Sequence, residues 1–167
     1  MSKSVSKAAF NQLIAEKDFA GLLQVFDQDA PTVRRLLTRI TYSPETLLHG
    51  NAIEAFCFLS KERGAAHPQF FREIIRRHVW GMNDEGGNID WSAPEIIGAT
   101  IAGSPDLFSD FIPIMFYAAV GEPTFRPSLI AALEMIAQID PAEAARYLEE
   151  LQVAEKSNGA CNRSALP

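Results

Sequence analysis

The 167-residue sequence has little cysteine, few histidines and no long apolar run. Two cysteines are too few for a disulfide framework: Cys57 lies in an apolar run, where it behaves as a small hydrophobe, and Cys161 lies in a polar segment. No apolar stretch reaches the roughly 20 residues of a membrane span, and residues 1–12 lack the apolar core of a secretory signal. These absences favour a cytoplasmic protein without a membrane partner.

Motifs of the common enzyme classes are also missing. The sequence has no glycine-rich phosphate loop, no nucleophilic serine motif and no Cys-x-x-Cys pair. Its three histidines, His49, His67 and His78, do not have the spacing of metal ligands. We therefore predict no catalytic residue, no metal and no cofactor, and we favour a non-catalytic protein.

Basic residues are scarce in the second half of the chain. Residues 30–80 carry eight Lys/Arg and four Asp/Glu, whereas residues 81–152 carry two and twelve. Binding to duplex nucleic acid requires many neutralised phosphates and is typical of domains with a broad basic surface. The charge asymmetry therefore disfavours a nucleic-acid partner.

Four prolines recur at nearly constant spacing. Successive members are 37, 37 and 36 residues apart, and each precedes a segment of helical periodicity: Pro31, Pro68, Pro105 and Pro141. Proline is favoured in the first turn of a helix because its missing N–H has no partner there in any case. Apolar residues recur in the same frame, one column being Leu37, Ile74, Phe111 and Tyr147. A period in the high thirties with two helices in each period predicts an all-α solenoid.

The repeat frame predicts where the helices lie. The first helices of the periods are expected over 31–40, 68–80, 105–119 and 141–152, and the second helices over about 49–62, 92–102 and 126–138. A shorter pair, 6–16 and 19–27, would cap the N-terminal end. We expect a single domain over 1–152, with capping helices in 1–29 and repeats in 30–152, followed by a disordered tail over 153–167. The alternative is a general helical bundle in which the proline spacing is accidental.

A specific motif lies between the second pair of predicted helices. Residues 83–95 read NDEGGNIDWSAPE. This segment resembles a pattern of uncharacterised bacterial HEAT-like proteins: Asn, acid, Glu, any, Gly, any, Ile, any, Trp, any, Ala-Pro-Glu. The resemblance implies an ARM/HEAT-type α-α superhelix of about three to four helix pairs, and it implies no activity. Gly86 stands where that family more often has serine.

The same loop is the first candidate binding site, because long insertions in repeat proteins often bind a ligand. Its candidate residues are Trp80, Asn83, Asp84, Glu85, Asn88, Asp90, Trp91 and Glu95. The alternative is a structural loop, in which the acids bond the backbone and the tryptophans anchor it to the core. We favour the structural loop, and expect Trp91 to be mostly buried and Asp84 or Asp90 to accept a backbone N–H.

Arginines form the second candidate site. Arg35 and Arg72 share one position in the 37-residue frame, and Arg39 and Arg76 share another. The two arginines of each helix are four residues apart and so lie on one face. Stacked helices would align the four in a ridge able to hold phosphate or an acidic peptide. Local pairing with acids such as Glu73 is the alternative, and we favour it.

These observations predict a non-catalytic protein-interaction module with a protein or peptide partner. One alternative is a ligand-binding or enzymatic site at the Trp80–Glu95 loop. Another is binding of a DNA backbone by the arginine ridge, as in HEAT-like DNA glycosylases. Convergence of Glu85, Asp90 and Glu95 in one open pocket would favour the enzyme, whereas acids satisfied within the loop would favour the interaction module.

Overall fold

The computed structural model describes residues 5–83 and 89–163, with side chains described as far as Ser157. Regular structure in these residues is entirely helical, with eight α-helices of eight or more residues and without a strand. The predicted all-α class is therefore confirmed. Within the same residues, no helix combines the length and apolar character needed to cross a membrane.

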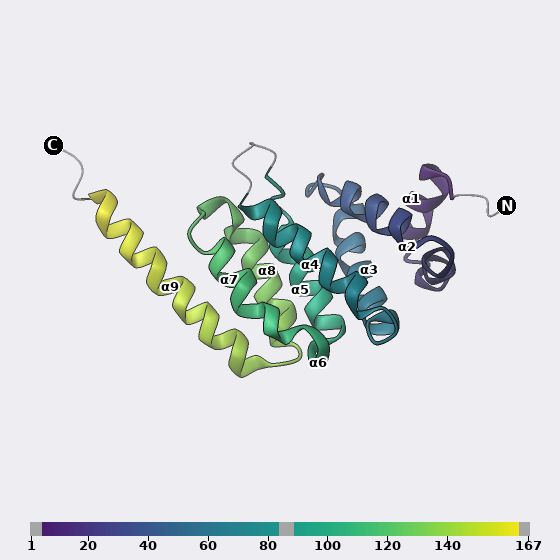
Figure 1. Ribbon diagram of the computed structural model, residues 1–167. Helices are drawn as coiled ribbons and strands as arrows, with labels where there is room; N and C mark the ends of the chain where they lie inside the picture. Colours follow the sequence, from purple (N-terminus) through teal and green to yellow (C-terminus); the bar gives the residue numbers. More distant parts are fainter. Residues whose placement is uncertain (1–4, 84–88, 164–167) are drawn as a thin grey trace.

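The elements follow one another along the long axis of the molecule, from α1 at one end to α9 at the other (Figure 1). Their bounds are α1 Lys7–Ala15, α2 Phe19–Thr41, α3 Leu47–Arg63, α4 Pro68–Met82, α5 Ala93–Gly103, α6 Pro105–Phe108, α7 Ile112–Ala119, α8 Arg126–Ala137 and α9 Pro141–Arg163, with 3-10 turns η1 Ser109–Phe111 and η2 Pro123–Phe125. Three of the four recurring prolines are the first residue of a helix, as predicted.

The fourth proline, Pro31, lies within α2 just after a break. Asp29 has non-helical dihedral angles, φ −153° and ψ 72°, and its Oδ1 accepts the N–H of Thr32 at 3.1 Å. An aspartate in this conformation acts as an N-cap. Helix α2 therefore consists of two segments that meet at Asp29, and they correspond to the predicted helices 19–27 and 31–40.

The predicted helix over 105–119 is divided into α6, η1 and α7. Pro113 has no N–H to donate to the carbonyl of Ser109, so the α-helical ladder is interrupted and restarts with Pro113 in the first turn of α7. The spacing of the apolar residues predicts helix over this segment, but it does not show that the helix is interrupted.

Helix α9 continues to Arg163, so residues 153–163 are helical where the sequence predicts a disordered tail. Arg126 of α8 forms an ion pair with Glu155, and Ala154 beside it is half-buried. These contacts tie the middle of α9 to α8, and beyond them the helix extends away from the rest of the molecule (Figure 1). Residues 164–167 lie outside the described part of the chain.

Helices α3, α5 and α8 pack side by side in chain order and form the most closely packed layer. Small residues allow this approach: a Cβ placed on Gly98 of α5 would lie 2.6 Å from the Cβ of Ala132 on α8. A Cβ on Gly103 would lie 2.2 Å from the carbonyl oxygen of Cys57 on α3. The other long helices pack onto this layer, α2 on α3, α4 on α5, α7 on α5 and α9 on α8.

The predicted apolar column forms part of the core. Its members Leu37, Ile74, Phe111 and Tyr147 are 0, 2, 7 and 1 % exposed. The residues repeat in the frame of the prolines because each occupies the inward face of a helix that begins in the same way. The prediction that the first three are buried is confirmed.

Candidate anion-binding site

The loop between α4 and α5 is described only at its two ends. Asp84, Glu85 and Asn88, three of the predicted site residues, lie outside the described residues. Asn83 is exposed, and its Nδ2 donates to the carbonyl oxygen of Val79 at 3.0 Å. Asn83 thus ends α4 by bonding its own last turn.

The two tryptophans of the loop are more exposed than predicted. Trp80 is 78 % exposed, and Trp91 is 47 % exposed with its ring 6.0 Å from that of Phe125. The expectation that Trp91 is mostly buried is therefore wrong. Beside it, Asp90 points inward, at 6 % exposure, and Ile89 is partly buried against the core.

Asp90 points inward because it pairs with a buried histidine. Its Oδ2 lies 2.7 Å from Nδ1 of His78 on α4, and its Oδ1 accepts the N–H of Ser92 at 3.2 Å. Ser92 in turn donates its hydroxyl to the carbonyl oxygen of Thr41 at 2.9 Å, which ties the loop to the end of α2. The prediction that an acid of this loop accepts a backbone N–H is confirmed for Asp90.

Glu95 serves a different histidine on the other side of α5. Its Oε2 lies 2.6 Å from Nε2 of His49 on α3, and its backbone N–H donates to Oγ of Ser128 on α8 at 3.0 Å. Asp90 and Glu95 line separate hollows. The described acids of the loop therefore do not converge on one active site, and the described residues contain no cluster of three or more potential metal-ligating side chains.

Sequence reasoning missed both histidine–carboxylate pairs, although a signal was present. His78 lies on the buried face of α4, which also carries Phe71, Ile74, Ile75 and Met82. A buried polar side chain is almost always hydrogen-bonded, so a histidine on an apolar face predicts a partner. The spacing does not say which acid provides it.

The four arginines of the predicted ridge are not on one surface. Arg72 turns toward the next element, where it pairs with Asp110 at 3.3 Å and donates to the carbonyl oxygen of Leu107 at 2.9 Å. Arg76 is exposed and is not among the residues of any hollow described below. Arg35 and Arg39, by contrast, face a hollow between α2 and α4.

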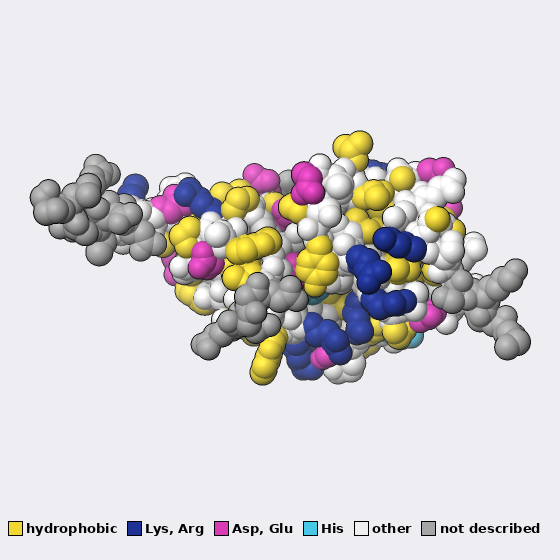
Figure 2. All heavy atoms as spheres, turned by 90° about the horizontal axis from the view of Figure 1, so that it is seen from above, with side chains coloured by type: hydrophobic (Ala, Val, Ile, Leu, Met, Phe, Trp, Pro, Cys, Tyr) yellow, Lys and Arg dark blue, Asp and Glu magenta, His cyan; other side chains and the backbone are white. Residues whose placement is uncertain are grey.

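This arginine hollow measures about 640 Å³ and is open to the surface. Its ionisable lining residues are Arg34, Arg35, Arg39, Tyr42, Arg77, His78 and Asp90. Figure 2 shows dark blue Lys and Arg side chains gathered on one part of this face of the molecule. Arg34 and Arg77, which were not among the predicted ridge residues, complete the site.

The positive charges in the hollow are crowded, and nearby acids offset them only in part: Asp29 interacts electrostatically with Arg35, and Glu73 with Arg34. Within the described chain, Arg34, Arg35 and Arg39 form no ion pair, and Arg77 pairs with Glu73 at 2.8 Å. Burial, followed by repulsion from Arg77, lowers the pKa of Arg34. A guanidinium group stays charged despite such a shift, so the hollow has a positive potential.

The side chains of Tyr42 and Asp29, which lie near the arginines, have pKa values shifted by their surroundings. Burial, followed by the charge of Asp90, raises the pKa of Tyr42, so its hydroxyl stays a hydrogen-bond donor. Hydrogen bonds from Thr32 lower the pKa of Asp29, and nearby Arg35 adds to this effect. Asp29 is thus a carboxylate that already serves as the cap of the second segment of α2.

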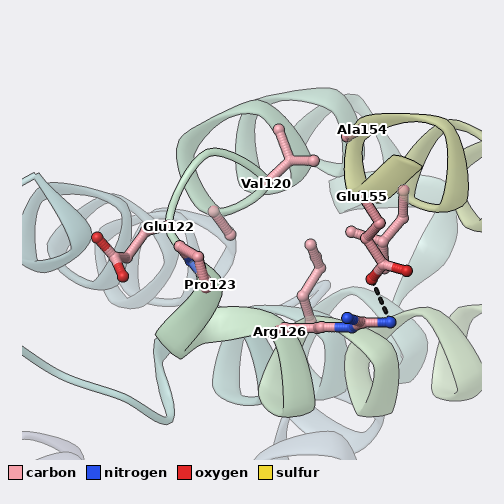
Figure 3. A pocket seen from close by; sticks show the side chains of 9 residues that line it. Val120, Glu122, Pro123, Arg126, Ala154 and Glu155 are labelled. Atoms are coloured by element: carbon pink, nitrogen blue, oxygen red, sulfur yellow. Dashed lines mark ion pairs between the residues drawn. The ribbon is translucent and has the colours of Figure 1, made fainter. Parts of the chain in front are cut away.

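A second pocket of the protein contains an arginine, Arg126, that is paired with an acid. It measures about 190 Å³ and lies between the α7–α8 connection and α9. Figure 3 shows Arg126 joined to Glu155 across it, with Val120, Pro123 and Ala154 on its walls. The charge of Arg126 is satisfied within the chain, so this pocket offers no comparable attraction for an anion.

The fold and the hollow define an all-α protein with a cationic site between two helices. Comparison of the chain with protein-family models, with curated proteins and with solved structures finds no match. The resemblance to HEAT-like repeat proteins therefore stays a prediction.

Proposed function

We propose that the protein is a HEAT-like repeat module that binds an acidic segment of a partner protein in the arginine hollow. The order of packing supports the repeat architecture. Helices α2 and α3, and α4 and α5, pack as successive pairs, and α3, α5 and α8 form one continuous layer. This is the arrangement expected when helical repeats contact only their neighbours.

The binding role is supported by the balance of donors and acceptors in the hollow. Asp90 is the one carboxylate among the described residues that line it, and His78 and Ser92 occupy its two oxygens. The lining arginines and Tyr42 are donors. A ligand that fits must therefore bring negative charge and acceptor oxygens, and guanidinium groups bind carboxylates through paired hydrogen bonds.

Fluorescence anisotropy with a labelled, glutamate-rich peptide tests this function. Replacing Arg35 and Arg39 together by alanine should weaken binding by roughly tenfold or more, because two charge-assisted contacts are lost. Arg76→Ala is the matched control: it removes an exposed arginine from α4 outside the hollow, and should change the affinity by less than about twofold. Binding should also weaken as salt is added.

Two results would contradict the proposal. Equal loss of binding in the Arg76 variant and in the double variant would mean that net charge, not the hollow, attracts the peptide. Tighter binding of duplex DNA of matched length, with the same dependence on Arg35 and Arg39, would assign the site to a nucleic-acid backbone instead.

A further inference from the structure

We infer that the arginine hollow recognises a phosphate monoester carried on a side chain of the partner segment. This inference rests on the proposed function and names the group that the site binds. It follows from how many positive charges meet at one place, from what they already contact, and from the size of the space between them.

The first argument is the charge. Four guanidinium groups line the hollow, and Glu73 forms an ion pair with one of them, Arg77. The remaining three, Arg34, Arg35 and Arg39, form no ion pair within the described residues, although Glu73 acts electrostatically on Arg34 and Asp29 interacts with Arg35. A phosphorylated side chain carries about −1.5 to −2 charges and three acceptor oxygens at neutral pH. One such group therefore matches several arginines at a single point.

The second argument is the mutual repulsion of the arginines. Arg34 is partly buried, and its guanidinium carbon lies 5.9 Å from the centre of the Phe70 ring. Burial and the charge of Arg77 disfavour its positive charge, and Glu73 offsets part of this effect. Two cations held near each other on α2 and α4 are stabilised when an anion lies between them. Because Arg34 and Arg77 come from different helices, the bound group would also bridge α2 and α4.

The third argument is that the surroundings are fixed and donor-rich. Asp90 holds the ring of His78, and each of its two oxygens already has a hydrogen-bond partner within the chain. Tyr42 adds a hydroxyl donor to the lining. At about 640 Å³ the hollow is larger than one phosphate group requires, so it has room for the side chain that carries the group.

A phosphodiester fits these features less well. Each phosphate of a nucleic-acid backbone carries one charge, and affinity for a duplex comes from many such contacts spread along the surface. Here the unpaired arginines meet in one hollow, whereas residues 81–152 carry two basic and twelve acidic residues. The geometry favours one highly charged group over a string of singly charged ones.

The test compares three labelled peptides that differ at one site, using the full chain and fluorescence anisotropy. One carries phosphoserine, the second serine, and the third two adjacent glutamates that match the charge of the phosphate. The phosphoserine peptide should bind roughly tenfold more tightly than the two-glutamate peptide, and the serine peptide should bind most weakly.

Variants then locate the interaction. Arg35→Ala/Arg39→Ala should remove the preference for phosphoserine, and Arg35→Lys/Arg39→Lys should reduce it, because lysine keeps the charge but loses the planar fork. Arg76→Ala should leave it unchanged. Arg35 and Arg39 are exposed, so circular dichroism of these variants should match that of the parent protein.

The outcomes separate this inference from the function on which it rests. Equal affinity for the two-glutamate and phosphoserine peptides would overturn the inference and leave the acidic-segment function standing, whereas no binding of either peptide would overturn both. A phosphoserine preference that survives Arg35→Ala/Arg39→Ala would place the site elsewhere. Inorganic phosphate or free phosphoserine binding as tightly as the peptide would make the ligand a small molecule, which also overturns it.

Discussion

Equivalent arginines have different surroundings in two successive spaces of the fold: the space between α2 and α4 (the first interval) and the space between α4 and the α6–η1 segment (the second interval). Arg35 on α2 and Arg72 on α4 are 37 residues apart and share one position in the proline frame. Arg72 crosses to the next element, where it contacts Asp110 and the carbonyl oxygen of Leu107. Arg35 forms no ion pair within the described chain and faces the arginine hollow. An equivalent position in the 37-residue frame therefore does not determine which residue an arginine pairs with.

The acid at the equivalent position has a different partner in the two cases. Glu73 stands 37 residues before Asp110 and so occupies the equivalent position. Glu73 pairs with Arg77, four residues later on its own helix. The residue four positions after Asp110 is Ile114, which offers no charge, so Asp110 is left to bind Arg72. The position four residues after the acid therefore carries an arginine in one case and an isoleucine in the other, and the acid differs in its partner accordingly.

Packing reinforces this difference. In the second interval Arg72 lies over the rings of Phe108 on α6 and Phe111 on η1, with its guanidinium carbon 5.7 and 5.4 Å from their centres. In the first interval α2 and α4 enclose the hollow instead. The second interval is therefore closed by Arg72, whereas the first interval contains the arginine hollow and is open to a ligand.

The largest expected effect is the loss of the core beneath the open interval. Ile74 is 2 % exposed and forms part of the floor of the hollow. Ile74→Ala should lower the free energy of unfolding by about 2–5 kcal/mol, because a buried isoleucine is replaced by a cavity. Ile114→Ala is the matched control, since Ile114 is 47 % exposed and should cost less than about 1 kcal/mol. Urea denaturation of both variants measures the difference, and equal losses would mean that Ile74 does not support the fold.

Helix positions and inward faces could be predicted from this sequence because they depend on local chemistry. Proline in a first turn and apolar residues at helical spacing act within one element, and they correctly place Ile74 and Phe111 in the core. The break at Pro113 is also local, but it leaves the apolar period intact and so was not predicted.

The charged contacts could not be predicted because they depend on competition between elements. The sequence shows that Arg35 and Arg72 are equivalent, but not that Glu73 pairs with Arg77 while Asp110 pairs with Arg72. The orientation of the loop side chains also depends on a contact with another element. Asp90 turns inward to reach His78, and Trp91 is turned toward the surface as a consequence. Such a choice requires knowing which helices are neighbours in space.

An effect of intermediate size on peptide binding is expected when the ion pair between Arg77 and Glu73 is removed. Arg77→Ala removes one cation from the hollow and releases Glu73, which already interacts electrostatically with Arg34. Binding of the acidic or phosphorylated peptide should weaken by roughly tenfold, because the released acid competes for an arginine of the site. Unfolding free energy should change by less than about 0.5 kcal/mol, since an exposed pair four residues apart contributes little.

Glu73→Gln is the reciprocal variant. It leaves all four arginines of the hollow in place and removes the acid that neutralises one of them, so peptide binding should strengthen by several-fold. Anisotropy titrations at one salt concentration measure both variants. Weaker binding in Glu73→Gln would show that the ion pair positions Arg77 and does not merely neutralise it.

The smallest effect is expected in the closed interval. Asp110→Asn removes one ion pair from Arg72 but leaves its hydrogen bond to Leu107 and its contacts with two aromatic rings. The Asp110 side chain is 62 % exposed, so the free energy of unfolding should fall by less than about 1 kcal/mol and peptide binding should stay unchanged. Urea denaturation and anisotropy test the two expectations, with Arg72→Ala as the control that removes every contact and should cost more. If Asp110→Asn instead created a second binding site for the peptide, the ion pair with Asp110, and not the packing against α6 and η1, would be what keeps Arg72 from acting as Arg35 does.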